Sequence, residues 1–388
     1  MAIEWVGKST LARPMIKSCF GLRSRSATRS RPSFGGHVGP HPRRRKRLAH
    51  DAGPPPNVRL TAVSTEPTLI STVLFPGAGA WTVFCDSQNG RLFAPERQPN
   101  PRRGQKDLML IRYGYELTLN CPRPTTMVCL LDAHRERLRD LRYETGLMTM
   151  PEIATSTYLD TFGNTVRRFI APAGDLTLSR DAVIEDSGVP DAIEEDAKEG
   201  PVEQLPNDTL VFLLGSRYCE TDKLADIAWQ LFGSKPPGWR RVQAICDFVC
   251  DRLTFGYAHA CTTRTAFEAY AERKGVCRDF AHLAVAFCRC MNIPARYANG
   301  FLGDIGVPPD PSPMDYNAWF EVYLDGRWFT FDARHNVPRI GRITVARGRD
   351  AADIALATSF GPHTLSKFRV WTEEIDDAVL ADLTRRTA

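Results

Sequence analysis

Cys277 is the residue whose type and position most favour nucleophilic chemistry in this sequence. It begins the stretch CRDFAHLAVAFCRCM, in which apolar residues recur at helical spacing from Phe280 to Met291. The cysteine is therefore expected at the first turn of a largely buried helix. Free N–H groups and the positive end of the helix dipole stabilise a thiolate there and lower the pKa of a thiol toward neutrality.

A second stretch, DYNAWFEVYLDGRWFTFDARHN, could supply the other half of a thiol site. Its alternating pattern predicts two strands joined by a tight Asp-Gly turn. Asp332, near the far end, is a candidate acid that could orient a histidine. The first strand, however, has no histidine and begins with Asn317. An amide forms hydrogen bonds but does not titrate near pH 7, so it cannot transfer protons as a histidine does.

Three histidines could substitute for the missing ring. His335 follows Asp332 by three residues, so it reaches the cleft if the chain bends there and faces the other side if the strand continues. His282 lies five residues after Cys277, about 140° around a helix and about 7.5 Å along it, which predicts a structural role. His259, in a loop, is a weaker candidate. His335 is thus the substitute base to test first.

The residues beside these candidates are expected to support the structure. Arg278 and Asp279, next to the cysteine, and Arg334, next to the acid, are predicted to form structural ion pairs. Trp319 could cover the cleft, but an aromatic residue on a strand before a hairpin more often belongs to the core.

The cysteines indicate reduced thiols. Eleven of them, an odd number, are scattered along a long chain, which favours a cytoplasmic protein over a disulfide framework. A metal site is conceivable, but the spacings do not repeat, and we expect buried structural cysteines, no metal and no cofactor. The residues considered for a metal site are Cys246, Cys250, His259, Cys261, Cys288 and Cys290.

Composition narrows the class of protein. Apolar residues make up 43% and charged residues 24% of the 388 residues, as in globular proteins, and no apolar run is long enough for a membrane span. Residues 1–50 hold twelve Lys and Arg against one acid, a charge of +11, so the rest of the chain sums to −6 within the total of +5. We therefore expect the folded part to bind neither nucleic acid nor a membrane.

The chain divides into five segments. Residues 1–107 read as a basic, disordered extension, which could be a transit peptide, a nuclear-localisation or nucleic-acid patch, or a segment upstream of a true start at Met109. Alternating strands predict a small β domain over 108–187. An acidic, proline-punctuated linker follows over 188–208. Helical patterns and the two stretches above define a core over 209–375, and 376–388 form a tail.

The core resembles the transglutaminase-like superfamily. GVCRDFAHLAVAFCRCMNIPARYANGFLGD, AWFEVYLDGRWFTFDAR and ARGRDAADIALATSFG occur in the order and spacing of its bacterial members, and the likeness extends from about Met109 to Trp371. The resemblance implies an α+β fold: a papain-like core of helices packed on an antiparallel sheet, preceded by a β domain. It also implies that Cys277 is the nucleophile, Asp332 the acid, and that Asn317 occupies the place of the histidine.

The resemblance leaves two functional hypotheses. In the first, Cys277 attacks an amide carbonyl, forms an acyl-thioester and is released by water, so the protein hydrolyses peptide or isopeptide bonds rather than cross-linking them. In the second, the protein is a pseudoenzyme that binds peptides in the same cleft, because Asn317 cannot transfer protons.

Overall fold

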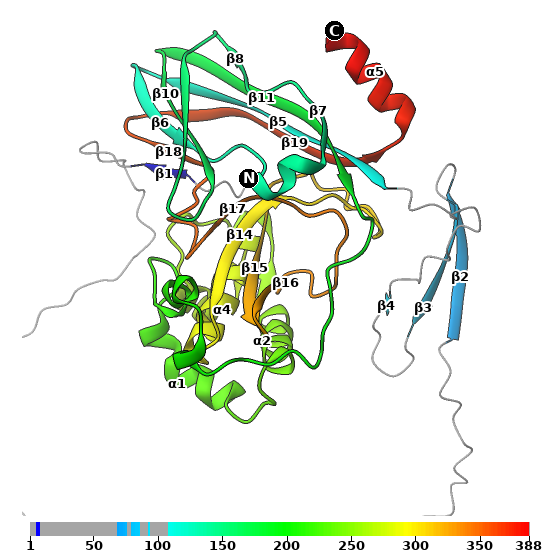
Figure 1. Cartoon of the computed structure of the whole chain (residues 1–388), viewed down its shortest axis with the longest axis vertical. Coiled ribbons are helices and arrows are strands. Elements are labelled where there is room, and N and C mark those ends of the chain that lie inside the picture. Colours follow the sequence, from blue (N-terminus) through cyan, green and yellow to red (C-terminus); the bar gives the residue numbers. More distant parts are fainter. Residues whose placement is uncertain (1–4, 8–67, 76–78, 86–91, 94–107, 388) are drawn as a thin grey trace, which may run out of the picture. The chain divides into compact units, whose positions relative to one another are not determined.

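The computed structural model describes residues 5–7, 68–75, 79–85, 92–93 and 108–387 (Figure 1). Strands β2 (Thr68–Phe75), β3 (Gly79–Cys85) and β4 (Leu92–Phe93) form a small antiparallel sheet in a unit of its own. These strands and β1 (Trp5–Gly7) lie within the segment expected to be a disordered extension. The rest of that segment, including its arginine-rich stretch, lies outside the described residues.

The predicted β domain is a pair of packed sheets. One sheet has the strand order β1-β18-β6-β10-β9, and the other has β19-β5-β11-β7 with β8 also paired to β11. The strands of this region are β5 (Met109–Cys121), β6 (Thr125–Cys129), β7 (Leu141–Glu144), β8 (Met148–Met150), β9 (Thr155–Leu159), β10 (Thr165–Ala171) and β11 (Gly174–Asp186), with a short helix η1 (Arg135–Asp140). The alternating residues of β5 from Ile111 to Leu119 are all buried, as their period of two predicts.

The end of the chain returns to this β domain, which corrects the predicted boundaries. Strands β18 (Ala357–Ser359) and β19 (Thr364–Ile375) were assigned to the core, but β18 pairs with β6 and β19 pairs with β5 along its length. The expected tail forms α5 (Asp377–Thr387), whose Leu383 packs on Leu110 and Val183. The physical reason is that the edges of β5 and β6 carry unpaired backbone groups that these strands satisfy.

The acidic linker is bound to the core by ion pairs. It contains the short helix η2 (Val202–Gln204), and η3 (Asn207–Leu213) begins at its end and continues into the core. Glu194 and Glu199 pair with Arg327 and Arg241, and Asp191 lies 2.9 Å from Arg342. The linker charges are therefore matched by arginines of the core.

The core packs helices against one antiparallel sheet, as expected for an α+β fold (Figure 1). The sheet has the order β16 (Arg327–Phe331), β15 (Asn317–Leu324), β14 (Ala295–Phe301), β17 (Ile343–Gly348). Helix α4 (Cys277–Cys290) is buried along its whole length between this sheet and the surrounding helices. Those helices are α1 (Thr221–Phe232), α2 (Trp239–Arg252) and α3 (Ala266–Glu272), with η4 (Tyr257–His259) and the short strands β12 (Thr254–Phe255) and β13 (Lys274–Gly275) between them.

The helical patterns predicted for the core are confirmed. Helix α1 begins at Thr221, and Glu220 holds its N-cap position. Thr265 caps α3 and forms a capping box with Glu268. Among the helices of the described segments, none has both the length and the apolar character that a membrane span requires.

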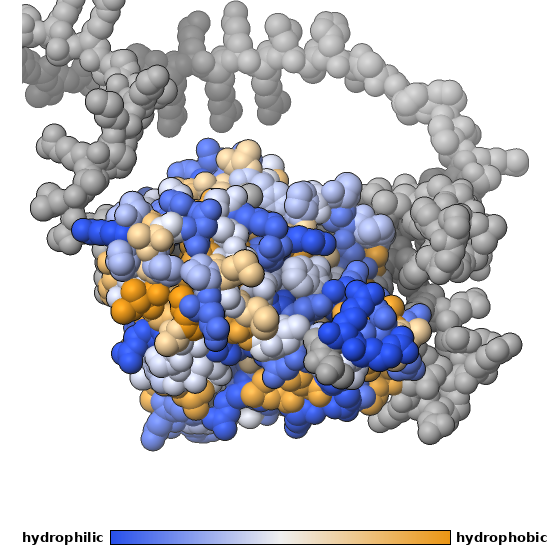
Figure 2. Space-filling view, turned by 90° about the horizontal axis from the view of Figure 1, so that it is seen from above, coloured by the Kyte–Doolittle hydropathy of each residue, from blue (hydrophilic) through white to orange (hydrophobic). Residues whose placement is uncertain are grey.

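The surface over the β domain is mixed in polarity. Figure 2 views the molecule from above and shows hydrophilic and hydrophobic residues interspersed across this face. The exposed apolar side chains of β8, β9 and β10 include Met148, Met150, Tyr158, Leu159 and Ile170. Isolated exposed apolar residues are normal on a protein surface, so they indicate no site by themselves.

Candidate active site

Cys277 is the first residue of α4, as predicted. The residue is 8% exposed, and its Sγ lies 3.9 Å from the backbone carbonyl oxygen of Tyr316, the residue before β15. Helix α4 packs on β15, so the first turn of the helix faces the start of that strand. The cysteine therefore sits where the helix N-terminus meets the sheet.

The start of α4 is fixed by a buried carboxylate. Asp279 accepts a hydrogen bond from the Val276 N–H at 2.9 Å and pairs with Arg264 at 3.1 Å and Arg278 at 3.3 Å. Burial raises the pKa of Asp279, although these cations oppose the shift. The predicted structural role of Arg278 and Asp279 is confirmed, because both groups hold the turn that presents Cys277.

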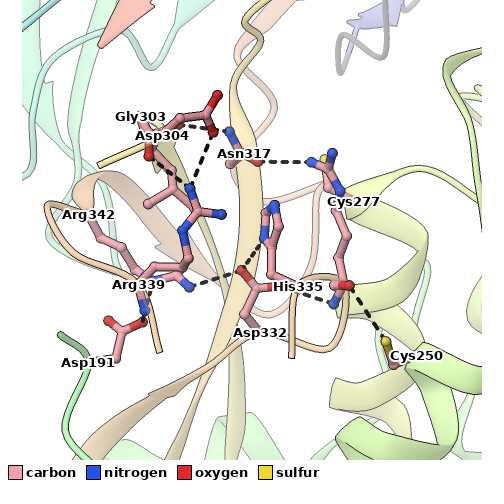
Figure 3. Close-up of polar contacts among 12 residues, drawn as sticks. Asp191, Cys250, Cys277, Gly303, Asp304, Asn317, Asp332, His335, Arg339 and Arg342 are labelled. Atoms are coloured by element: carbon pink, nitrogen blue, oxygen red, sulfur yellow. Dashed lines mark hydrogen bonds and ion pairs between the residues drawn. The ribbon is translucent and has the colours of Figure 1, made fainter. Parts of the chain in front are cut away.

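His335 and Asp332 form a hydrogen-bonded pair. The chain bends directly after β16, where the Asn336 N–H donates to the Asp332 carbonyl at 2.8 Å. The Nδ1 atom of His335 then lies 2.9 Å from Oδ2 of Asp332. The structure thus adopts the bent alternative, and in Figure 3 the His335 ring stands between Asp332 and Asn317.

Asp332 is a buried carboxylate held between two partners. Its Oδ2 also accepts a hydrogen bond from Arg342 at 2.9 Å, and Arg342 in turn binds Asp191 (Figure 3). Burial alone would raise the pKa of Asp332, but His335 and Arg342 outweigh it and hold the pKa well below its usual range. The group is therefore ionised at neutral pH and can orient the His335 ring.

Asn317 is engaged at both ends of its amide. The nitrogen donates to the carbonyl oxygens of Asp315 and Leu302 at 3.3 and 3.5 Å, and the oxygen accepts from Nη1 of Arg334 at 3.1 Å. Arg334 was expected to form a structural ion pair, but it binds this neutral amide instead and lies 3.7 Å from the centre of the Phe255 ring. The place of the expected histidine thus holds an amide that anchors a cation.

A narrow cavity is lined by Asn317, Arg334 and His335, whereas Cys277 and Asp332 are not among its lining residues. Its volume is about 60 Å³, and its lining residues are Tyr257, Leu302, Asp304, Asp310, Ser312, Pro313, Met314, Asp315, Asn317, Arg334, His335 and Arg339. Burial raises the pKa of Tyr257; Arg334 opposes this shift, and Asp315 and Cys277 add to it. Cys277 is therefore within electrostatic reach of a residue that lines the cavity.

The remaining histidine candidates and Trp319 have structural rather than catalytic roles. His282 is completely buried, accepts a hydrogen bond from the Ala351 N–H at 3.1 Å and stacks on Tyr218. Burial lowers the pKa of His282, which keeps the ring neutral. Trp319 is 1% exposed and belongs to the core. His259 lies in η4, and its carbonyl oxygen accepts a hydrogen bond from Arg264.

Most other cysteines are buried thiols with little nucleophilic character. Burial raises the pKa of Cys219 to about 12 and that of Cys290 to about 11, and it raises the pKa of Cys246 and Cys288 as well. Cys261 differs, because a hydrogen bond with Thr263 lowers its pKa at a half-buried position. Within the described segments, no three His, Cys, Asp or Glu side chains are grouped to hold a metal ion.

The fold and the site define the class of protein. A cysteine that begins a buried helix, opposite an antiparallel sheet with an aspartate after its edge strand, is the arrangement of a papain-like thiol core. The pattern of the Transglutaminase-like superfamily matches residues 226–333, from α1 to the turn after β16. The chain belongs to the transglutaminase-like superfamily, as its sequence resemblance implied.

Known bacterial proteins are similar to this chain. The crystal structure of a "putative cysteine protease" from Cytophaga hutchinsonii is 30% identical with a TM-score of 0.61, over 70% of this chain and 92% of that one. An uncharacterised protein of Mycobacterium leprae is 24% identical over 53% of this chain and 76% of its own length. One of Mycobacterium tuberculosis is 28% identical over 51% of this chain and 69% of its own length.

Sequence reasoning missed several residues of the site. Arg342 and Asp191 complete the environment of Asp332, and Tyr257 lines the cavity. Arg342 could have been suspected, since basic residues inside the apolar run RIGRITVARG must be buried and therefore paired. Its partner Asp191 could not have been predicted, because it lies about 150 residues earlier in the chain.

Proposed function

We propose that the protein is a cytoplasmic, cysteine-dependent hydrolase of peptide or isopeptide bonds, with Cys277 as nucleophile and His335 as the group that transfers protons. The observation that supports this most is the 2.9 Å hydrogen bond between Nδ1 of His335 and Asp332. It provides an acid-oriented imidazole in a site that has no histidine at position 317. His335, in the turn after β16, would therefore take the role of the histidine expected at the start of β15.

In the proposed reaction, the Cys277 thiolate adds to the carbonyl carbon of the amide. The tetrahedral intermediate collapses when its C–N bond breaks and the amine leaves with a proton from protonated His335, so an acyl-thioester remains. His335 then takes a proton from water, the hydroxide adds to the thioester, and the thiolate leaves as the acid product forms. Backbone N–H groups of the first turn of α4 would stabilise the oxyanion.

The test is hydrolysis of a casein digest, followed by mass spectrometry, with the purified full-length protein. We expect Cys277→Ser to abolish cleavage and His335→Gln to reduce its rate by on the order of 10²–10⁴. Cys261→Ser, which removes the half-buried thiol away from the cavity, is the matched control and should cleave normally. Cleavage that persists in Cys277→Ser would refute the proposal.

A second candidate function is peptide binding without turnover. It is favoured by the engagement of the Asn317 amide with Arg334 and two carbonyl groups, because these contacts hold a group that does not titrate near neutral pH in the place of the histidine. New hydrolysis in Asn317→His that is absent from the parent would support this view. Hydrolysis in the parent that disappears in Cys277→Ser would exclude it.

A further inference from the structure

The turn after β16 places both a cation and a base at the cavity. Arg334 and His335 are consecutive, and both side chains line the cavity with Asn317. The backbone N–H groups of Arg334 and His335 each donate to Oδ1 of Asp332 at 3.0 Å. A single buried carboxylate therefore fixes the positions of both residues, and its other oxygen orients the His335 ring.

We propose that Arg334 is a positioning residue that supplies beside Cys277 the permanent positive charge a thiol site otherwise takes from a protonated histidine. This inference rests on the proposed function only in treating Cys277 as the nucleophile. The two tasks of the missing histidine are then divided: Arg334 stabilises the thiolate, and His335 transfers protons. A guanidinium suits the first task and excludes the second, because it does not lose its proton in proteins.

The anchoring of Arg334 places its charge next to the chain segment that contacts the Cys277 sulfur. Its Nη1 donates to Asn317 Oδ1 at 3.1 Å, and its guanidinium lies on Phe255. Asn317 directly follows Tyr316, whose carbonyl oxygen is 3.9 Å from the Cys277 sulfur. The group that holds Arg334 and the group that contacts the sulfur therefore belong to consecutive residues at the start of β15, and Figure 3 shows Asn317 and Cys277 on the same side of His335.

Electrostatics connects the same two residues through Tyr257. After burial, the largest influence on the pKa of Tyr257 is Arg334, which lowers it, and Cys277 acts on the same hydroxyl in the opposite direction. A cation and a thiol that both act on one hydroxyl group lie in one electrostatic environment. The same influence of Arg334 would favour the anionic form of the cysteine.

The other charged groups around the site do not duplicate this charge. Asp310 and Asp315 come from the loop before β15 and oppose a thiolate, while Tyr257 comes from η4. Arg339, the other cavity arginine, donates to the Gly303 carbonyl at 2.9 Å and lies 3.4 Å from Asp304. Arg334 is therefore the cavity arginine whose side-chain hydrogen bond goes to a neutral amide. Asp310 lies within its electrostatic reach, because, after local hydrogen bonds, Arg334 helps to lower the pKa of that carboxyl, and Arg278, next to Cys277, is paired with Asp279 at 3.3 Å.

The experiment measures how the alkylation rate of Cys277 by iodoacetamide depends on pH in the full-length protein. Alkylation forms a carbon–sulfur bond and releases iodide, so its rate follows the thiolate fraction. Peptide mass spectrometry separates Cys277 from Cys261, the other thiol favoured to react. The variants are Arg334→Gln, Arg334→Ala and Arg334→Lys, with the exposed Arg240→Gln as the matched control.

We expect Arg334→Gln and Arg334→Ala to move the midpoint of the Cys277 profile upward by about one pH unit or more, which slows alkylation at neutral pH about tenfold. Arg334→Lys keeps the charge and should move the midpoint less, and Arg240→Gln should not move it. An unchanged midpoint in whichever neutral variant retains the parent's circular dichroism spectrum would overturn the inference.

A second measurement uses the missing histidine itself. In an Asn317→His background, an imidazole can supply the charge, so adding Arg334→Gln should move the midpoint less than it does in the parent. An equal shift in both backgrounds would contradict the division of tasks. Alkylation needs no substrate, so a shift without hydrolysis would refute only the proposed function, and hydrolysis without a shift would refute only the role of Arg334.

Discussion

Arg342 lies between two carboxylates, with Nη2 2.9 Å from Asp332 of the site and Nε 2.9 Å from Asp191 of the linker. The guanidinium side chain is 7% exposed, so its charge is balanced almost entirely by these partners. The linker therefore contributes to the active-site environment, because Asp191 helps to hold the arginine that stabilises the Asp332 carboxylate.

Replacing Arg342 should destabilise the protein strongly. Arg342→Met removes the partner of two carboxylates and leaves the buried Asp332 without its permanent positive charge, so we expect a loss of about 3–5 kcal/mol in the free energy of unfolding. Urea unfolding followed by tryptophan fluorescence measures it. Arg327→Met, which removes an exposed pair between the linker and the core, is the control and should cost about 0–1 kcal/mol. Equal losses in the two variants would show that burial of Arg342 is not the cause.

Asp332 should make stability depend on pH in the acid range. Its folded-state pKa is depressed, so its contribution is complete above the unfolded value of about 3.9 and is lost as pH falls toward the folded value. The free energy of unfolding of the parent should therefore fall more steeply than that of Asp332→Asn from about pH 4 downward. Asp382→Asn, in the exposed part of α5, is the control and should follow the parent. Parallel curves for Asp332→Asn and the parent would contradict the depressed pKa.

The parts of the fold that follow from local periodicity could be predicted. The period of two in β5 identified the buried face from Ile111 to Leu119, and the helical period after Cys277 identified α4 and placed the cysteine in its first turn. Both patterns report burial directly, because one face of each element must meet the core. They need no knowledge of which element lies opposite.

The parts of the fold and of the site that depend on partners distant in the sequence could not be predicted. The sequence did not decide on which side of the sheet His335 lies, because its side depends on the bend after β16. One local signal was present: an aspartate whose carboxylate accepts the N–H groups two and three residues later is a known turn former. The return of β19 to β5, more than 240 residues apart, has an alternating pattern but no local sign of its partner. Pairing across such distances depends on which sheet edges are left unpaired by the other strands. A single sequence does not show which edges these are.

The docking of β19 should be sensitive to a single methyl group on β5. Gly114 is paired with Trp371, and a Cβ at Gly114 would overlap the Arg180 carbonyl oxygen and the Trp371 ring. Backbone on one side cannot move away, so Gly114→Ala should cost about 1–3 kcal/mol or more of unfolding free energy. Thermal denaturation measures the change. Gly200→Ala, where the nearest atom is 3.7 Å away, is the control and should leave the melting temperature nearly unchanged.

The cysteines of the described core should differ sharply in reactivity under native conditions. Cys261 and Cys277 should be alkylated first at neutral pH, because Cys261 has a lowered pKa and Cys277 begins helix α4, where the helix dipole favours a thiolate. Cys246 and Cys288 are buried thiols with raised pKa values, so they should react only when the core opens. Peptide-resolved alkylation with and without denaturing urea measures both groups. Fast native labelling of Cys246 or Cys288 would contradict the packing of α2 and α4, whereas labelling of those two only in urea is the outcome that the buried core requires.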